Sequence, residues 1–362
     1  MTGSRSWNRA PRRRAGRLVR VLVVPLLALA MAGTAFPGEA GEGRAAEVRE
    51  RGAGRVWARP VVEPYLSLGW GDPPDPAALL RATGVDGFTF AFVLSAGGCE
   101  PRWDGERPLT GGVDERALRA VRVAGGEPVV SFGGGAGRKL EEDCPDAAAL
   151  AGAYRKVIGA YGLNAIDVDI ELDAYENGAV RRRTVEALKL VEAADPDLRL
   201  SVTLPSHPTG PDARLIDAAA RAGLEPDVWT IMPFAFGTPP VDEAAARQAR
   251  RRDMARAAVT AAAGLVRRLR EAYGYDTATA RAHSGVSTMN GITGHQEVIT
   301  VEDFRTVAWY ARASGLARLS FWSANRDRPC GTLPYPAEDR CSGVSQRPWE
   351  FTRALTSPGR RS

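Results

Sequence analysis

Acidic and aliphatic side chains alternate through residues 164–171, which read Asn-Ala-Ile-Asp-Val-Asp-Ile-Glu. Successive side chains of a β-strand point to opposite faces, so Asp167, Asp169 and Glu171 would share one face. A row of like charges makes it costly to ionise all three groups, so at least one pKa should rise. A carboxylic acid that stays protonated near neutral pH is what a general acid requires. A half-buried strand with one wet acidic face would show the same alternation, so the spacing alone leaves both interpretations open.

Short apolar runs alternate with helical stretches rich in alanine and arginine, and this order predicts a parallel α/β fold. The expected strands are residues 61–68, 87–95, 128–132, 165–172, 200–204, 228–236, 282–288 and 317–323. The expected helices are residues 75–83, 114–124, 146–161, 179–194, 212–222, 242–273, 300–314 and 348–355. Eight such units predict a (β/α)8 TIM barrel in a single domain, with Glu171 at the strand ends where barrel enzymes act. A doubly wound sheet is the alternative, but the turn at residues 69–74 lacks its nucleotide-binding glycine pattern.

The N-terminal 35 residues have the order of charge and hydropathy that is typical of a secretory signal peptide. Seven arginines and no acidic residue fall in the first 20 positions, an apolar run follows over residues 21–32, and small residues end the segment. The run is too short for a comfortable membrane span, so we expect no stable membrane anchor. The protein is therefore expected to be secreted and extracellular, with a flexible leader over residues 36–58 and one folded domain over residues 59–358.

Charge and cysteine content narrow the expected partners. The seven arginines of the signal peptide exceed the net charge of +5 of the whole chain, so the rest is slightly acidic and nucleic acid is not an expected partner. Export makes disulfides plausible, and the short interval favours Cys330–Cys341, which leaves Cys99 with Cys144. The cysteines form no CxxC pair and the three histidines are scattered, so we expect no metal, and no cofactor is expected either. We also expect the protein to be a monomer.

Three further segments lie where strands are expected to end. Residues 131–137, Ser-Phe-Gly-Gly-Gly-Ala-Gly, allow the backbone to approach a ligand or a neighbouring strand, and both uses stay open. Trp322 near the end of the eighth strand could stack on a sugar ring or lie in the core. Met232 and Phe234 at the end of the sixth strand could line a pocket or belong to the core.

Together these motifs resemble glycoside hydrolase family 18, the chitinases and their relatives. Residues 164–171 are similar to the family's Asp-x-x-Asp-x-Asp-x-Glu motif, and residues 131–134 look like its Ser-x-Gly-Gly motif on the preceding strand. Leu-Pro at residues 204–205, Pro-Thr-Gly at 208–210 and the Trp-Ser-Ala-Asn-Arg-Asp-Arg run at 322–328 look like a bacterial secreted subgroup. The resemblance covers roughly residues 60–355 and implies a TIM barrel with a retaining, substrate-assisted mechanism.

The resemblance also implies roles for individual residues. Glu171 would protonate the glycosidic oxygen and later act as a base toward water. Asp169 would hold the acetamido N–H of the substrate, and Asp167 would share a proton with Asp169. The ring of Trp322 would form the floor of the subsite that holds the reacting sugar. The remaining residues expected on the substrate side are Met232, Phe234, Ser131 and Gly133.

Two positions depart from the family's pattern. The first Asp of the strand-four motif is Asn164, and the sixth strand reads Met-Pro-Phe-Ala-Phe instead of Met-x-Tyr-Asp or Met-x-Met-Asp-Tyr. Ala235 replaces that Asp, and losing such positioning groups can cost roughly a hundredfold each in rate. Asn290 and Thr293, after the seventh strand, are candidates to replace the lost contacts.

We expect a hydrolase of β-1,4-linked N-acetylglucosamine, acting on chitin or its oligomers. Two alternatives stay open. The first is a catalytically silent, lectin-like protein that binds chitin or another glycan. The second is an endo-β-N-acetylglucosaminidase that cleaves the glycan core of glycoproteins. The retained Asp167, Asp169 and Glu171 favour an enzyme, whereas Phe234 and Ala235 favour a binding protein.

Overall fold

The computed structural model describes residues 58–331 and 340–357. The signal peptide expected over residues 1–35 and nearly all of the leader expected over 36–58 therefore lie outside the described residues. In the part of the chain that is described, no helix has the length and hydropathy needed to cross a membrane.

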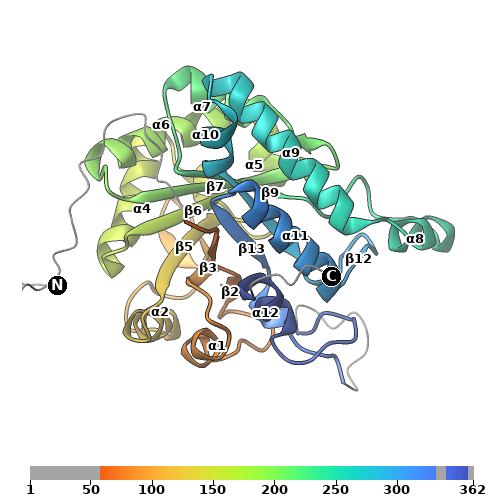
Figure 1. Cartoon of the computed structure of the whole chain (residues 1–362). Helices are drawn as coiled ribbons and strands as arrows, with labels where there is room; N and C mark the ends of the chain where they lie inside the picture. The colour runs from red at the N-terminus through yellow and green to blue at the C-terminus, as the bar shows by residue number, and fades with distance from the viewer. Residues whose placement is uncertain (1–57, 332–339, 358–362) are drawn as a thin grey trace, which may run out of the picture. The chain divides into compact units, whose positions relative to one another are not determined.

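The strands close into a barrel in the order in which they occur along the chain (Figure 1). β1 (Val61–Val62) pairs with β13 (Arg318–Trp322), and β2 (Tyr65–Ser67) pairs with β3 (Gly87–Ser95). Only two residues separate β1 from β2, so the ring closes through this one extended segment. The other strands of the ring are β5 (Glu127–Gly133), β6 (Ala165–Asp169), β7 (Arg199–His207), β9 (Val228–Met232) and β10 (Ser284–Met289). This is the predicted (β/α)8 barrel in a single domain.

Helices surround the barrel strands (Figure 1). They are α1 (Pro76–Thr83), α2 (Val113–Val123), α3 (Leu140–Asp143), α4 (Ala147–Tyr161), α5 (Leu172–Glu176), α6 (Gly178–Ala194), α7 (Arg214–Ala222), α8 (Glu243–Arg250), α9 (Met254–Tyr273), α10 (Thr277–Ala282), α11 (Val301–Ser314), α12 (Glu350–Thr356) and the 3-10 turn Ala324–Arg326. Short strands outside the ring are β4 (Pro101–Trp103), β8 (Gly210–Pro211), β11 (Gly291–Ile292) and β12 (Val298–Ile299). Thr300 and Asp303 form a reciprocal capping box at the start of α11, as expected of a Thr at a helix N-terminus.

All eight predicted strands are present, but the fourth and the sixth end several residues earlier than predicted. The fourth, expected to reach residue 172, ends at Asp169, because α5 begins at Leu172 and Glu171 occupies its N-cap with an extended backbone. The sixth, expected to reach residue 236, ends at Met232. Because Glu171 remains extended at φ −130°, the alternation of faces continues past the end of the strand.

Two other predicted elements have different boundaries in the structure. The single helix predicted over residues 242–273 is two helices, because Asp253 caps a new helix by accepting the backbone N–H of Arg256. The seventh strand begins at Ser284 instead of residue 282, because Asp276 caps the short helix α10 in front of it.

Strand β6 separates an apolar face from a polar face, as its sequence predicts. Ile166, Val168 and Ile170 are buried in the main hydrophobic cluster. Asp167 and Asp169 share the other face and are also buried. The site is therefore built on a rigid strand whose opposite side is anchored in the core.

Candidate active site

Asp167 is fully buried and accepts hydrogen bonds on both carboxylate oxygens. The hydroxyls of Tyr65 and Ser131 donate to Oδ2 at 2.8 and 2.7 Å. The Thr203 hydroxyl and the Arg318 guanidinium donate to Oδ1 at 2.8 and 3.0 Å. Ser131 has no exposed surface, so it supports this carboxylate from the third strand. That position corrects its expected place on the substrate side.

Asp169 lies one alternation further along the same face and is 3% exposed. Burial is the main reason that its pKa is raised well above the ordinary range, and the charges of Glu171 and Asp167 raise it further. Arg318 and Lys139 oppose this rise. Oδ1 of Asp169 is buried and has no hydrogen-bond partner among the described residues. The surroundings therefore favour a protonated Asp169 in the free protein.

Glu171 follows at the mouth of the barrel, where its side chain is partly exposed. Burial raises the pKa of Glu171 to about 7, and the nearby Lys139 ammonium acts in the opposite direction. The backbone of the glycine-rich loop lies against the carboxyl group, because a Cβ built on Gly135 would stand 3.3 Å from Glu171 Oε1. A carboxyl group that titrates near neutrality can give and take a proton in one catalytic cycle.

Lys139 is a site residue that the sequence analysis missed. It is 6% exposed, and its ammonium donates to the carbonyl of Ala136 within the glycine-rich loop. Burial lowers its pKa, whereas the charges of Glu171, Glu141 and other nearby acids raise it. The sequence held little signal for this role, because one lysine after a glycine-rich stretch is usually solvated.

Gly133 lies where β5 packs closely against β6. Its φ is +90°, and a Cβ at this position would lie 2.1 Å from the carbonyl oxygen of Asp169. The next residue, Gly134, donates its N–H to that same carbonyl at 2.8 Å. Gly133 therefore positions Asp169. The sequence left open whether this glycine lets the backbone approach a ligand or a neighbouring strand, and in the structure it approaches the neighbouring strand.

Aromatic rings gather around Trp322 at the end of β13. The Phe92 ring stacks on the indole with centroids 5.6 Å apart and an interplanar angle of 11°. Trp70 meets it edge-on at 6.0 Å, and Tyr65 lies at 5.9 Å. Trp322 is partly exposed and Trp70 is 38% exposed, so the cluster offers apolar ring surface at the mouth. Phe92 and Trp70 were not singled out in the sequence.

The segment directly after β9, residues 234–236, has no polar side chain that could hold a substrate, and Glu297 fixes its backbone instead. Met232 is 8% exposed, and Phe234 packs partly buried against the main hydrophobic cluster. Ala235 has φ +53°, and its N–H donates to the carboxylate of Glu297 at 2.7 Å. No hydroxyl or carboxylate side chain occupies residues 234–236.

Asn290 and Thr293 are both buried and form part of the loop structure. Oδ1 of Asn290 accepts the backbone N–H of Ser323 at 2.9 Å. The Thr293 hydroxyl donates to the Glu297 carboxylate at 3.3 Å. These contacts brace the loops around Trp322 and Ala235, so the structure places neither side chain as a surface contact for a sugar.

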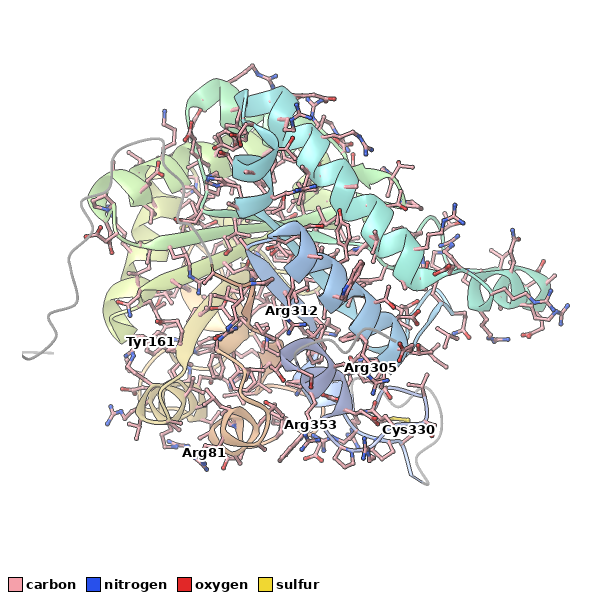
Figure 2. The ribbon with its side chains drawn as sticks, in the orientation of Figure 1. Arg81, Tyr161, Arg305, Arg312, Cys330 and Arg353 are labelled. Carbon is pink, nitrogen blue, oxygen red and sulfur yellow. A yellow bond between two sulfur atoms is a disulfide. The ribbon has the colours of Figure 1, made fainter. Side chains whose placement is uncertain are left out.

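Both expected disulfides are present, Cys99–Cys144 and Cys330–Cys341, and the second is drawn in yellow in Figure 2. Cys144 directly follows helix α3, so the first bond ties the segment after Lys139 to the loop after β3. Among the described residues, no group of three or more His, Cys, Asp or Glu side chains could hold a metal ion.

Comparisons with known proteins find similarity to chitinases. No protein-family model matches the chain. It is 28% identical over 289 residues to the probable bifunctional chitinase/lysozyme of Escherichia coli K12, covering 77% of this chain and 32% of that protein. It is 26% identical over 287 residues to Endochitinase 11 of Metarhizium anisopliae, covering 76% and 54%. The chain thus spans about a third to a half of the length of these curated relatives.

A solved structure gives the fold-level match. The catalytic domain of the hyperthermophilic chitinase from Pyrococcus furiosus superimposes with a TM-score of 0.70 at 25% identity, covering 84% of this chain and 95% of that domain. The chain is therefore similar to chitinases in sequence over about three quarters of its length, and it shares their barrel fold. In this chitinase-like protein the strand-four carboxylates are retained, and the sixth strand has lost the polar side chains that the family's motif would place there.

Proposed function

We propose that the protein hydrolyses β-1,4-linked N-acetylglucosamine polymers or oligomers by a retaining, substrate-assisted mechanism. The observation that carries the proposal is the position of Glu171, a carboxyl group at the barrel mouth whose pKa is raised to about 7 by burial. At neutral pH it is available in both protonation states, as a group that acts first as an acid and then as a base requires. The names of the relatives, chitinase and endochitinase, support the substrate class.

In the proposed first step, Glu171 donates its proton to the glycosidic oxygen as the bond to the anomeric carbon breaks. The acetamido oxygen of the same sugar attacks that carbon and forms an oxazolinium ion. A carboxyl oxygen of Asp169 accepts the acetamido N–H, and the Glu171 carboxylate left by the first proton transfer balances the developing positive charge. Glu171, now ionised, takes a proton from water. The water oxygen attacks the anomeric carbon as the bond to the acetamido oxygen breaks, which gives overall retention. Trp322 provides the flat surface on which the reacting sugar rests.

A glycan-binding protein without activity is the second candidate. Its support is the β9 end, where Ala235 and Phe234 replace the polar groups that hold the acetamido oxygen in related sequences. A binding protein has no need for a proton donor, so the raised pKa of Glu171 argues for the enzyme. An endo-β-N-acetylglucosaminidase would share every step of the mechanism and differ only in the glycan that it accepts.

The proposal is tested by turnover and binding measured on the same samples. The mature wild-type protein and its Glu171→Gln variant are offered chitin oligomers and a glycoprotein glycan, with mass spectrometry for products and calorimetry for binding. Cleavage by the wild type together with binding alone by the variant supports the proposal. Binding without cleavage by either protein would establish the lectin-like candidate, and cleavage of only the glycoprotein glycan would establish the endo-β-N-acetylglucosaminidase.

Export is part of the proposal, because chitin is an insoluble polymer outside the cell. The arginine-rich and apolar segment at residues 1–35 and the two disulfides support a secreted, monomeric protein. N-terminal sequencing of protein from the culture medium tests the cleavage site, and light scattering tests the monomer. A chain that stays in the cell with its N-terminus intact would overturn the expected location.

A further inference from the structure

Two guanidinium groups and two carboxylates lie together inside the barrel. Arg199 pairs with Glu63 at 3.0 Å, and Arg318 pairs with Asp167 at 3.0 Å. Arg318 also lies 3.5 Å from Glu63, so the two pairs form one group. All four side chains are at most 6% exposed. Two positive and two negative charges balance, which is the condition under which buried ions are tolerated.

Arg318 is held in one orientation by neutral groups from other strands. One guanidinium nitrogen donates to the hydroxyl of Thr89 at 2.7 Å, and the other donates to that of Thr230 at 3.1 Å as well as to Asp167. The neighbouring strand leaves room for it at Gly285, where a Cβ would lie 3.0 Å from the Arg318 Cβ. The guanidinium cannot move away from Asp167 without losing these contacts.

Asp167 is consequently saturated as an anion. A carboxylate offers about four acceptor sites, and four donors already occupy them. One of these donors is Arg318, which can only donate a hydrogen bond and cannot accept one. Burial and the charges of Asp167 and Asp169 raise the pKa of Tyr65, which stays a neutral donor. A proton on Asp167 would therefore displace one of these four donors, and the Arg318 guanidinium is the one donor that cannot turn to accept it.

Asp169 is a further buried carboxyl group on β6, and neither of the two ion pairs includes it. It is 3% exposed, and its buried Oδ1 lacks a partner among the described residues. An ionised Asp169 would add an uncompensated negative charge to a neutral buried group. Glu171 and Lys139, the other charged groups that face it, lie at the mouth and contribute opposite signs.

We propose that Arg318 is a positioning residue that favours the ionised form of Asp167, so that of the two β6 aspartates Asp169 is the one that carries a proton in the resting enzyme. The proposal deepens the proposed function, on which its catalytic meaning rests. Arg318 touches no substrate and acts through Asp167. Arg318 favours ionisation of Asp167 because a cation beside a carboxylate stabilises the charged form of that carboxylate.

The test reads protonation directly and needs no substrate. Mature protein with 13C-labelled aspartate is titrated by NMR in an Asp169→Asn background, where the Asp167 signal is assigned by its loss in Asp167→Asn. The protein that retains Arg318 gives the reference titration of Asp167. In Arg318→Met the titration should move up by more than about one pH unit, and Arg318→Lys should restore part of the difference. An unchanged titration of Asp167 would overturn the proposal, as would an ionised Asp169 in the wild type at pH 7.

A milder pair of variants covers the case in which Arg318 variants fail to fold. Thr89→Val with Thr230→Val removes two acceptors that orient the guanidinium while keeping side-chain volume. We expect a smaller upward shift of Asp167 and a several-fold loss in kcat with little change in KM, whereas no shift in the carboxyl titration would refute the role of Arg318. Absence of oligosaccharide cleavage by the wild type would instead refute the proposed function, and the titration would still decide the role of Arg318.

Discussion

The carboxylate of Glu297 accepts the backbone N–H of Ala235 at 2.7 Å. It also accepts the N–H of Phe236 at 3.1 Å and the guanidinium of Arg252 at 2.6 Å, and it is fully buried. This acid therefore binds the backbone of the segment in which the motif that the sequence resembles has a Tyr and an Asp. The loop after β9 keeps a defined shape although Ala235 has lost the side-chain function.

Replacing Glu297 by Ala should destabilise the fold strongly, because two backbone donors would lose a buried acceptor and the exposed Arg252 would lose its ion-pair partner. We expect a loss of about 2–4 kcal/mol in the free energy of unfolding, measured by denaturant titration. The control is Glu243→Ala, since Glu243 pairs with Arg250 on the surface and should change stability by less than about 0.5 kcal/mol. Equal effects of the two changes would contradict the anchoring role of Glu297.

A hydroxyl returned to the β9 end should raise the rate of cleavage. Phe234 is partly buried at the position of the family's Tyr, so Phe234→Tyr adds one donor for the acetamido oxygen. We expect kcat to rise by roughly tenfold or more with little change in KM, because the new contact strengthens in the transition state. Steady-state kinetics on a chitin oligomer provides the measurement. Phe236→Tyr is the control, since Phe236 lies beneath the Arg252 guanidinium; a similar gain there would contradict the argument.

Much of the barrel could be predicted from the sequence, because each strand is a short apolar run between capped helices. The strand Gly87–Ser95 begins and ends at the residues predicted. The spacing of Asp167, Asp169 and Glu171 placed all three on one face, and the structure keeps that alternation beyond the end of β6. Local signals of this kind act over a few residues, so they can be read without knowledge of the fold.

Contacts between distant strands could not be read in the same way. Arg318 stands at the start of an apolar run and meets Asp167 from 151 positions away. Glu297 reaches Ala235 across 62 positions. Nothing in either local sequence distinguishes these side chains from solvated ones, because their role depends on the closure of the barrel. The same reason explains why Ser131 and Gly133 support the aspartates and do not line the substrate side.

Removing the Lys139 charge should shift the alkaline limb of the pH profile upward. The ammonium lowers the pKa of Glu171, so its loss lets that pKa rise above about 7. The general acid then remains protonated to higher pH, and we expect the limb of kcat/KM to move up by about half a pH unit or more in Lys139→Met. Lys139→Arg should retain the wild-type profile. Lys156→Met is the matched control, because Lys156 pairs with Glu100 on the surface; a downward or absent shift in Lys139→Met would contradict the assignment.

The raised pKa of Glu171 should also make the active site a source of instability at neutral and higher pH. Its pKa in the folded protein is about 7, against an ordinary value of 4.5, so its ionisation is disfavoured by folding. The contribution of Glu171 to stability is complete below about pH 4.5 and is lost as the pH rises through about 7. Glu171→Gln removes this loss. The difference in the free energy of unfolding between the variant and the wild type should therefore be more favourable to the variant at pH 8 than at pH 4, by on the order of 1–3 kcal/mol. Denaturant titrations at both pH values measure the difference. The exposed Glu302→Gln should give parallel curves, and parallel curves for Glu171→Gln as well would show that folding does not raise the pKa of Glu171.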